Sequence, residues 1–193
     1  MTETHTHKRF PDRLCFLLNN PVRRHLNPPD RLIFKLGINN EHTIVDFGCG
    51  PGFYTIPLAR VARRTIGIDV SSKMLKRTSE YAQREAVTVQ LIESDGTAIN
   101  LEDNSVDLIL TVHVYHEITD REKVLGEFSR ILKPDGRLAV VERTRGGVLS
   151  SRFGAPIMQL EKITNELTTL GFVCHETIKN GDDSALIAKH KVR

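Results

Sequence analysis

The sequence predicts a doubly wound α/β fold, with a mostly parallel seven-stranded sheet that ends in an antiparallel hairpin. From residue 43 onward, short apolar runs rich in β-branched residues alternate with helical patterns, which is typical of repeated β-α-β units. A glycine-rich loop joins the first of these strands to the helix that follows it. Near the end, Asn180 and Gly181 separate two strand-like runs, and Asn-Gly between such runs is a strong hairpin signal.

Each predicted element has a boundary signal of its own. The predicted parallel strands cover residues 43–47, 64–70, 87–93, 106–112 and 137–142, and those of the hairpin cover 172–179 and 184–190. The predicted helices cover residues 54–63, 72–84, 120–132 and 157–170. Ser71 or Ser72 suits the N-cap of the second helix, and Asp120 suits the start of the third. The Lys-Pro-Asp-Gly run at 133–136 predicts a turn before the fifth strand.

The 193 residues are expected to form one domain, spanning 1–193, that is large enough to bury a hydrophobic core. We expect residues 1–12 to be a flexible tail. Apolar residues at helical spacing predict short helices within 13–36 that cover the functional site. The glycine-containing loop 144–156 completes this cover as a mobile lid.

Composition excludes several classes of protein. The net charge of +3, the absence of Trp and the lack of a long basic run make a nucleic-acid footprint weak. No run approaches the ~18 apolar residues needed to cross a bilayer, and no secretory signal pattern opens the chain. Cys15, Cys49 and Cys174 lie far apart without metal-ligand spacing, so we expect neither disulfides nor a metal site. We therefore expect a reducing cytoplasm and no membrane.

The glycine-rich loop carries the strongest functional signal. Residues 46–53 read Asp-Phe-Gly-Cys-Gly-Pro-Gly-Phe, and glycine is required where a Cβ would block a ligand or forbid positive φ. Asp46 lies inside the strand, two residues before the first glycine. This pattern resembles the first motif of the class I S-adenosylmethionine (SAM)-dependent methyltransferases. The resemblance implies that the loop contacts the methionine part of SAM, with Asp46 oriented toward its ammonium group.

A second carboxylate follows the second strand. Residues 66–71 read Ile-Gly-Ile-Asp-Val-Ser, which places Asp69 at the carboxyl end of that strand. A carboxylate there can accept hydrogen bonds from both ribose hydroxyls of a nucleoside cofactor. Val70 and Met74 are expected neighbours of the adenine ring.

Two further strand ends complete the resemblance. Methyltransferases that resemble this chain place an acid after the third strand to accept the adenine amino group, and Asp95 with Gly96 matches that place. Thr111 and Val112, at the end of the fourth strand, are expected beneath the methionine and the sulfonium. Asp107, at the start of that strand, is expected to be structural.

These segments cover most of residues 43–142, so the chain resembles a small methyltransferase of the type 11-like methyltransferase-domain family, which has a Rossmann-like sheet. The resemblance implies one set of SAM-binding residues: Asp46, Gly48, Cys49, Gly50, Gly52, Phe53, Asp69, Val70, Met74, Ser94, Asp95, Gly96, Thr111 and Val112. The main competing cofactor is NAD, because Asp69 would serve its ribose equally well. The NAD fingerprint G-x-G-x-x-G places its third glycine where this chain has Phe53.

The candidate catalytic residues directly follow the fourth strand, where an acceptor would meet the methyl group: His113, Tyr115, His116 and Glu117. Histidine has a suitable ordinary pKa for a general base, and Tyr or Glu can position an amine or hydroxyl. The same His-x-x-His-Glu run also suits hydrogen bonding within the loop. Its spacing implies no third metal ligand.

We expect a SAM-dependent methyltransferase that acts on an unidentified acceptor, with a small molecule favoured. The absence of an Asn/Asp-Pro-Pro-Tyr run after the fourth strand argues against methylation of amino groups on nucleic-acid bases, while a protein or another RNA acceptor stays open. A different class also stays open, namely a catalytically silent SAM-binding partner subunit or sensor. The sequence predicts neither the acceptor atom nor the oligomeric state.

Overall fold

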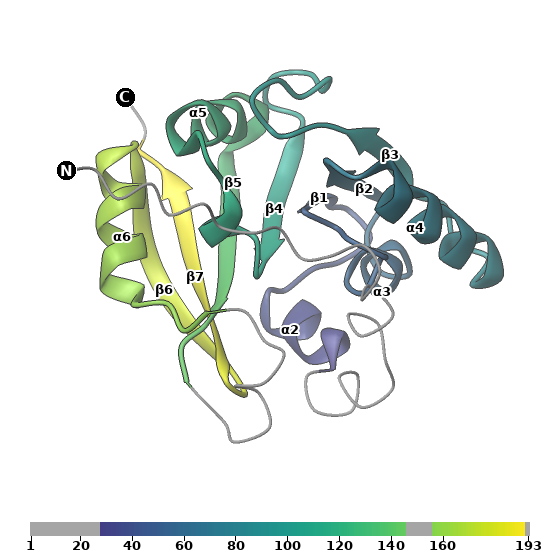
Figure 1. Cartoon of the computed structure of the whole chain (residues 1–193), viewed down its shortest axis with the longest axis horizontal. Helices are drawn as coiled ribbons and strands as arrows, with labels where there is room; N and C mark the ends of the chain where they lie inside the picture. Colours follow the sequence, from purple (N-terminus) through teal and green to yellow (C-terminus); the bar gives the residue numbers. More distant parts are fainter. Residues whose placement is uncertain (1–27, 146–155, 192–193) are drawn as a thin grey trace.

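One sheet, with strand order β3-β2-β1-β4-β5-β7-β6, runs through the middle of the protein and carries helices on both faces (Figure 1). The computed structural model describes residues 28–145 and 156–191. The strands are β1 (Thr43–Phe47), β2 (Arg64–Asp69), β3 (Gln90–Glu93), β4 (Val106–Val112), β5 (Leu132–Arg143), β6 (Phe172–Asn180) and β7 (Asp183–His190). The helices are α2 (Pro29–Lys35), α3 (Thr55–Ala59), α4 (Ser72–Arg84), the 3₁₀ turn η2 (Tyr115–Glu117), α5 (Arg121–Ile131) and α6 (Leu160–Thr169). The predicted fold class is confirmed.

The strand order reverses between β1 and β4. From β1 the parallel sheet continues through β2 to β3 on one side and through β4 to β5 on the other. In such sheets ligands bind beyond the carboxyl ends of the strands at the point of reversal. β7 lies antiparallel between β5 and β6, which confirms the predicted hairpin.

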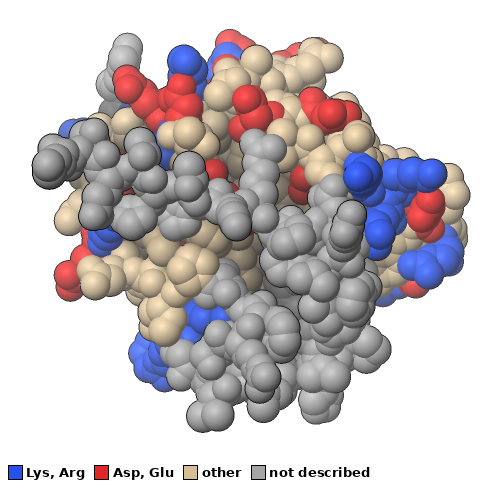
Figure 2. Space-filling model, viewed as in Figure 1, with Lys and Arg blue, Asp and Glu red and all other residues tan. Residues whose placement is uncertain are grey.

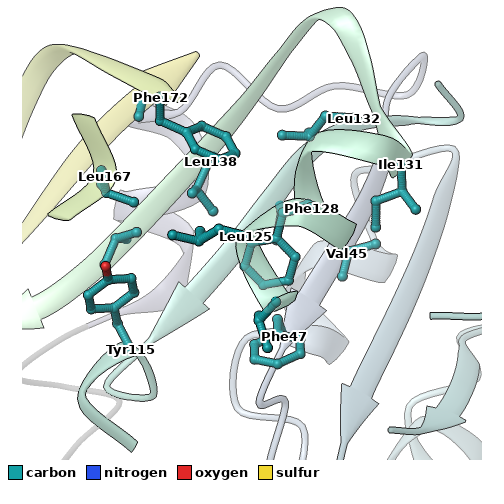
Figure 3. Packing of buried hydrophobic residues seen from close by; sticks show 14 of the residues in the cluster. Val45, Phe47, Tyr115, Leu125, Phe128, Ile131, Leu132, Leu138, Leu167 and Phe172 are labelled. Carbon is teal, nitrogen blue, oxygen red and sulfur yellow. The ribbon is translucent and has the colours of Figure 1, made fainter. Parts of the chain in front are cut away.

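The sheet separates two hydrophobic layers. Side chains that alternate along each strand enter opposite layers, as the pleat of a strand requires. α5 and α6 contribute to the larger layer, in which Phe47 packs edge-on against Phe128 with ring centroids 4.9 Å apart (Figure 3). α2 and α3 contribute to the other layer. Burial on both faces keeps β1 and β4 rigid, so the loops at their carboxyl ends have a fixed base.

Helix α4 is amphipathic. It buries Met74 and Leu75 and exposes a basic outer face, which appears at the right of Figure 2. Ser71 caps the helix by accepting a hydrogen bond from Met74 N at 3.4 Å. Asp120 caps α5 in the same way, from Lys123 N at 3.2 Å. Both predicted caps are confirmed.

Some boundaries differ from those predicted. α3 ends at Ala59 instead of residue 63, and β3 begins at Gln90 instead of residue 87. The turn predicted at 133–136 falls inside β5, which begins at Leu132. These four residues have no partner in β4, because Val106 pairs with Leu132 and Leu108 pairs with Arg137. The predicted tail 1–12, the helix proposed around 13–18 and residues 146–155 of the predicted lid lie outside the described residues. Within the described ranges, no helix is both long and apolar enough to cross a membrane.

Candidate active site

The glycine loop after β1 is built from residues with positive φ. Gly48, Gly50 and Gly52 have φ of 72°, 52° and 85°, a region that side chains disfavour. Gly48 N and Cys49 N both donate to the carbonyl of Ile68, at 2.8 and 3.0 Å, which fixes the loop against β2. The loop is therefore a rigid backbone surface at the carboxyl edge of the sheet.

The three glycines differ in what surrounds them. A Cβ on Gly48 would lie 2.3 Å from Cγ2 of Val114, so the loop after β4 packs directly on the glycine loop. A Cβ on Gly52 would lie 3.2 Å from Thr78 in α4. Among the described residues, none lies within 4 Å of a Cβ placed on Gly50. The described part of the structure therefore leaves room for a ligand to approach this backbone.

Asp69 lies at the end of β2 beside that opening. Its carboxylate accepts hydrogen bonds from Gly50 N at 2.8 Å and from Ser71 N at 2.9 Å. The hydroxyl of Thr78 donates to the carbonyl of Gly50 at 2.7 Å and braces the loop from the other side. Each carboxylate oxygen can accept more than one hydrogen bond, so Asp69 retains capacity for sugar hydroxyls.

Asp46 is a buried acid behind the glycine loop. Its side chain accepts a hydrogen bond from Thr55 Oγ1 at 2.6 Å and is only 3% exposed. Burial raises the pKa of Asp46 to about 7; the Thr55 hydrogen bond opposes this rise and the charge of Asp69 adds to it. A cationic group bound nearby would favour the ionised form of Asp46.

The loop after β3 packs on the end of β1. Gly96 has φ of 89°, and a Cβ there would lie 2.6 Å from Cζ of Phe47. The exposed Asp95 accepts two hydrogen bonds from Thr97, from the backbone N–H at 2.9 Å and the hydroxyl at 2.7 Å. Gly96 N donates to Ser94 Oγ at 3.0 Å. These turns place Asp95 on the same sheet edge as Asp69.

Other predicted cofactor residues are mainly buried. Phe53 and Met74 are 4% and 6% exposed, and Thr111 is fully buried in β4. The thiol of Cys49 lies 3.1 Å from the position of a Cβ on Gly67, and burial raises its pKa. Val70, by contrast, is 41% exposed directly after Asp69. Of these side chains, only that of Val70 presents an apolar surface to a ligand.

The loop after β4 carries two histidines, and each lies close to a buried carboxylate of a neighbouring strand. His113 has φ of 57° and its backbone N–H donates to Val141 O at 2.9 Å. Its Nε2 lies 3.0 Å from Oδ1 of Asp183, a side chain 3% exposed at the start of β7. Positive φ at a non-glycine residue is a strained conformation of the kind that clusters at functional sites.

His116 forms the second pair. Its Nδ1 lies 3.1 Å from both Oε1 and Oε2 of Glu142, near the end of β5. The backbone N–H of His116 also donates to Glu142 Oε1, at 3.4 Å. His116 and Glu142 are 7% and 1% exposed, so each partner compensates the burial of the other.

Tyr115 and Glu117 occupy different environments. Tyr115 is fully buried in the larger layer beside Leu167, and its hydroxyl donates to Glu166 at 3.2 Å (Figure 3). Burial and the charge of Glu166 raise the pKa of Tyr115 far above its ordinary value. Glu117 has Oε1 4.0 Å from Nε2 of His116 and a side chain 31% exposed. The structure therefore places Tyr115 in the core and leaves the side chain of Glu117 partly exposed.

Sequence reasoning missed Glu142 and Asp183, the carboxylates that lie beside His116 and His113. Glu142 interrupts the apolar run of the fifth strand, a charged residue at a strand end that could have been noticed. Asp183 gave no such signal, because it follows a hairpin turn where Asp is common. Among residues 28–145 and 156–191, no three His, Cys, Asp or Glu side chains are arranged to hold a metal ion.

Comparisons with known proteins match the chain to methyltransferases. A family model described as a methyltransferase domain matches residues 45–140. The chain is 29% identical over 103 residues to YcgJ of Bacillus subtilis, an uncharacterized methyltransferase, covering 53% of this chain and 41% of YcgJ. It is 32% identical over 126 residues to the demethylmenaquinone methyltransferase of Tropheryma whipplei (strain Twist), covering 65% of this chain and 50% of that protein. The chain thus spans about half or less of these two relatives.

A solved structure matches over a larger share. The crystal structure of a SAM dependent methyltransferase from Aquifex aeolicus superposes with a TM-score of 0.84, covering 93% of this chain and 98% of that chain. Sequence identity between the two is 24%, so this likeness shows a shared fold.

Proposed function

We propose that this chain, which belongs to the class I SAM-dependent methyltransferase family, transfers a methyl group from SAM to a small-molecule acceptor. One observation carries the proposal: the carboxylate of Asp69, at the end of β2, accepts a hydrogen bond from the backbone of Gly50 in the loop after β1, and β1 borders the point where the strand order reverses. A nucleoside with an attached amino acid needs a carboxylate for its ribose and an open backbone for its polar groups. Both are present at this edge.

The donor set fits SAM. Asp69 would accept hydrogen bonds from the ribose hydroxyls, and the exposed Val70 would lie against adenine. Asp95 would accept the adenine amino group, while Gly48 and Gly50 would approach the methionine part. The other residues of the predicted set are proposed to line the cofactor site or to support the loops around it: Asp46, Cys49, Gly52, Phe53, Met74, Ser94, Gly96, Thr111 and Val112.

The buried carboxyl of Asp46 is suited to bind a cationic group. This carboxyl, held by Thr55, would pair with the ammonium group of SAM and lose its own proton as that cation binds. An NAD-type ligand offers no ammonium group to this acid. This difference supports SAM over NAD.

SAM supplies a methyl group already activated by the positive sulfonium, so the protein mainly orients the acceptor and removes its proton. His116, His113 and Glu117 are the proposed groups for that work, because they follow β4 beside the glycine loop. Tyr115 is fully buried in the core, so it is not proposed as a group that contacts the acceptor. This set of proton-accepting side chains supports an enzyme over a silent SAM-binding subunit.

The acceptor class rests on the relatives. One of them is a demethylmenaquinone methyltransferase, whose name states a small-molecule acceptor. We propose a small acceptor for this chain as well, bound by the single domain formed by its 193 residues. The thiols of Cys49 and Cys174 are unpaired with each other, which supports a reducing cytoplasm as the compartment.

Isothermal titration of the purified chain with S-adenosylhomocysteine tests the cofactor assignment, with NAD as the control ligand. We expect micromolar binding of S-adenosylhomocysteine and none of NAD. Binding of NAD alone, or of neither ligand by a folded chain, would contradict the proposal. A screen of small phenols, thiols and amines with radiolabelled SAM then identifies an acceptor.

A further inference from the structure

We infer that Glu142 is a positioning residue that fixes the proton of His116 on Nδ1, so that Nε2 is the nitrogen that accepts a proton from the methyl acceptor. The inference rests on the proposed function and deepens it by naming a residue that acts through His116. Sequence reasoning did not single out Glu142, and its role follows from the geometry around His116.

The carboxylate of Glu142 determines which nitrogen of His116 carries the proton. Nδ1 lies 3.1 Å from both carboxylate oxygens, and an ionised carboxylate can only accept hydrogen bonds. Nδ1 must therefore donate, which in a neutral imidazole leaves Nε2 unprotonated. The tautomer of His116 is thus a consequence of the position of Glu142.

Burial makes this arrangement rigid. Glu142 is 1% exposed and belongs to β5, which is hydrogen-bonded on both sides, to β4 and to β7. Its Oε1 also accepts the backbone N–H of His116 at 3.4 Å, so the carboxylate contacts both the ring and the main chain of the same residue. The imidazole has little freedom to turn away from this carboxylate.

The loop that carries His116 packs on the glycine loop. Val114, two residues before His116, contacts the position that a Cβ on Gly48 would occupy. The pair is therefore joined through η2 to the loop proposed to contact the methionine part of SAM. Nε2 is the ring nitrogen turned away from Glu142, and Glu117 Oε1 lies 4.0 Å from it.

The charge balance of methyl transfer explains a carboxylate in this position. The acceptor atom would form a bond to the methyl carbon, the carbon–sulfur bond would break with its electron pair left on sulfur, and the proton of the acceptor atom would move to Nε2. The products would be the methylated acceptor, S-adenosylhomocysteine and a protonated His116, which returns its proton to water. The positive charge of the sulfonium thus passes to an imidazolium whose Nδ1 already contacts a carboxylate, which stabilises that charge.

Glutamine at position 142 should reverse the tautomer. Its carbonyl oxygen would accept the backbone N–H of His116, and its NH₂ group would then face Nδ1 and donate to it. Nδ1 becomes an acceptor and the proton moves to Nε2, which can no longer act as a base. Replacement of an orienting carboxylate by its amide has this effect in Ser-His-Asp enzymes.

Nitrogen-15 NMR of the histidine rings tests the inference on the full chain saturated with S-adenosylhomocysteine, and His116→Gln identifies the signals of His116. We expect an Nδ1–H tautomer in the natural protein and an Nε2–H tautomer in Glu142→Gln. Asp107→Asn is the matched control, because it makes the same change in a carboxylate at the opposite edge of the sheet, and it should leave the His116 signals unchanged.

An Nε2–H tautomer in the natural protein would overturn the inference, and this result does not require any variant to fold. An unchanged tautomer in a folded Glu142→Gln variant would also overturn it. Failure of the proposed function gives a different result, since S-adenosylhomocysteine would then not bind to the natural protein.

Discussion

The carboxylate of Asp69 accepts a hydrogen bond from the backbone N–H of Gly50 at 2.8 Å, so the acid proposed to bind ribose also supports the glycine loop. The same carboxylate accepts Ser71 N, just before helix α4. One side chain thus joins the end of β2, the glycine loop and the start of α4. Its replacement should affect ligand binding and local order together.

Asp69→Asn should weaken binding of S-adenosylhomocysteine about 10- to 100-fold, because a charge-assisted hydrogen bond contributes about 1.5–3 kcal/mol. Asn retains one acceptor oxygen and loses the hydrogen bond to either Gly50 N or Ser71 N, so the melting temperature should fall as well. Titration calorimetry measures the affinity. Asp103→Asn is the control, since Asp103 pairs with Arg130 on the surface and should leave binding unchanged. Equal affinities in the two variants would exclude Asp69 from the site.

Gly48→Ala should destabilise the protein by about 2 kcal/mol or more, because its Cβ would lie 2.3 Å from Val114 and its φ is 72°. Binding of S-adenosylhomocysteine should fall in the same variant. Gly126→Ala provides the contrast, because Gly126 is a helical residue in α5 with nothing within 4 Å of a Cβ. That change should stabilise the protein by about 0.5–1 kcal/mol. Denaturant unfolding of both variants measures the difference.

The raised pKa of Asp46 predicts a pH effect on stability. The folded protein binds this proton more tightly than the unfolded chain, so the stabilisation is complete below pH 3.8 and is lost as pH rises through about 7. Asp46→Asn, which cannot ionise, should flatten the decline over this interval. Thermal unfolding across the pH range tests this expectation, and parallel curves for the two proteins would contradict it.

The raised pKa of Asp46 also predicts how pH changes the thermal stabilisation by S-adenosylhomocysteine. The ammonium group of S-adenosylhomocysteine favours ionised Asp46, so the ligand should raise the melting temperature more at about pH 8 than at about pH 6. In Asp46→Asn this difference should disappear. A difference of equal size in the variant would assign the pH effect to another group.

Turnover should separate His116 and Glu142 from the SAM-binding residues. With an acceptor from the screen, His116→Gln and Glu142→Gln should each lower kcat about 10²- to 10⁴-fold, which is the range for loss of a general base. The KM for SAM should stay within about twofold, since neither residue is proposed to contact SAM. Asp107→Asn should keep the kcat of the natural protein. A rise in the KM for SAM in His116→Gln, without a fall in kcat, would assign His116 to SAM binding.

Local signals predicted much of this protein. Strand β1, the glycine loop and the caps at Ser71 and Asp120 depend on neighbours within a few residues, and sequence periodicity captures such neighbours. Asp69 was predictable because a strand end followed by a helix fixes its place on the sheet edge. The catalytic and cofactor roles stay predictions.

Sequence patterns did not predict the contacts between residues that lie far apart in the chain. The pairing of His113 with Asp183 depends on the register between β5 and β7, in which Arg143 lies opposite Asp183. No local pattern encodes that register. Tyr115 was a candidate for positioning the acceptor because it follows a strand, yet packing against α6 buries it completely. Burial of that kind is decided by the partner helix and not by the residue's own segment.

The position of β7 has a consequence for how the protein is made. β7 fills the place between β5 and β6, and it brings Asp183 to His113 although the two residues are far apart in sequence. During synthesis the glycine loop emerges early, while β5 keeps an open edge until the hairpin arrives. A nascent chain stalled before residue 183 would thus carry the proposed cofactor loop, while His113 would lack its partner Asp183. Methyltransferase activity would then begin only when the sheet is complete.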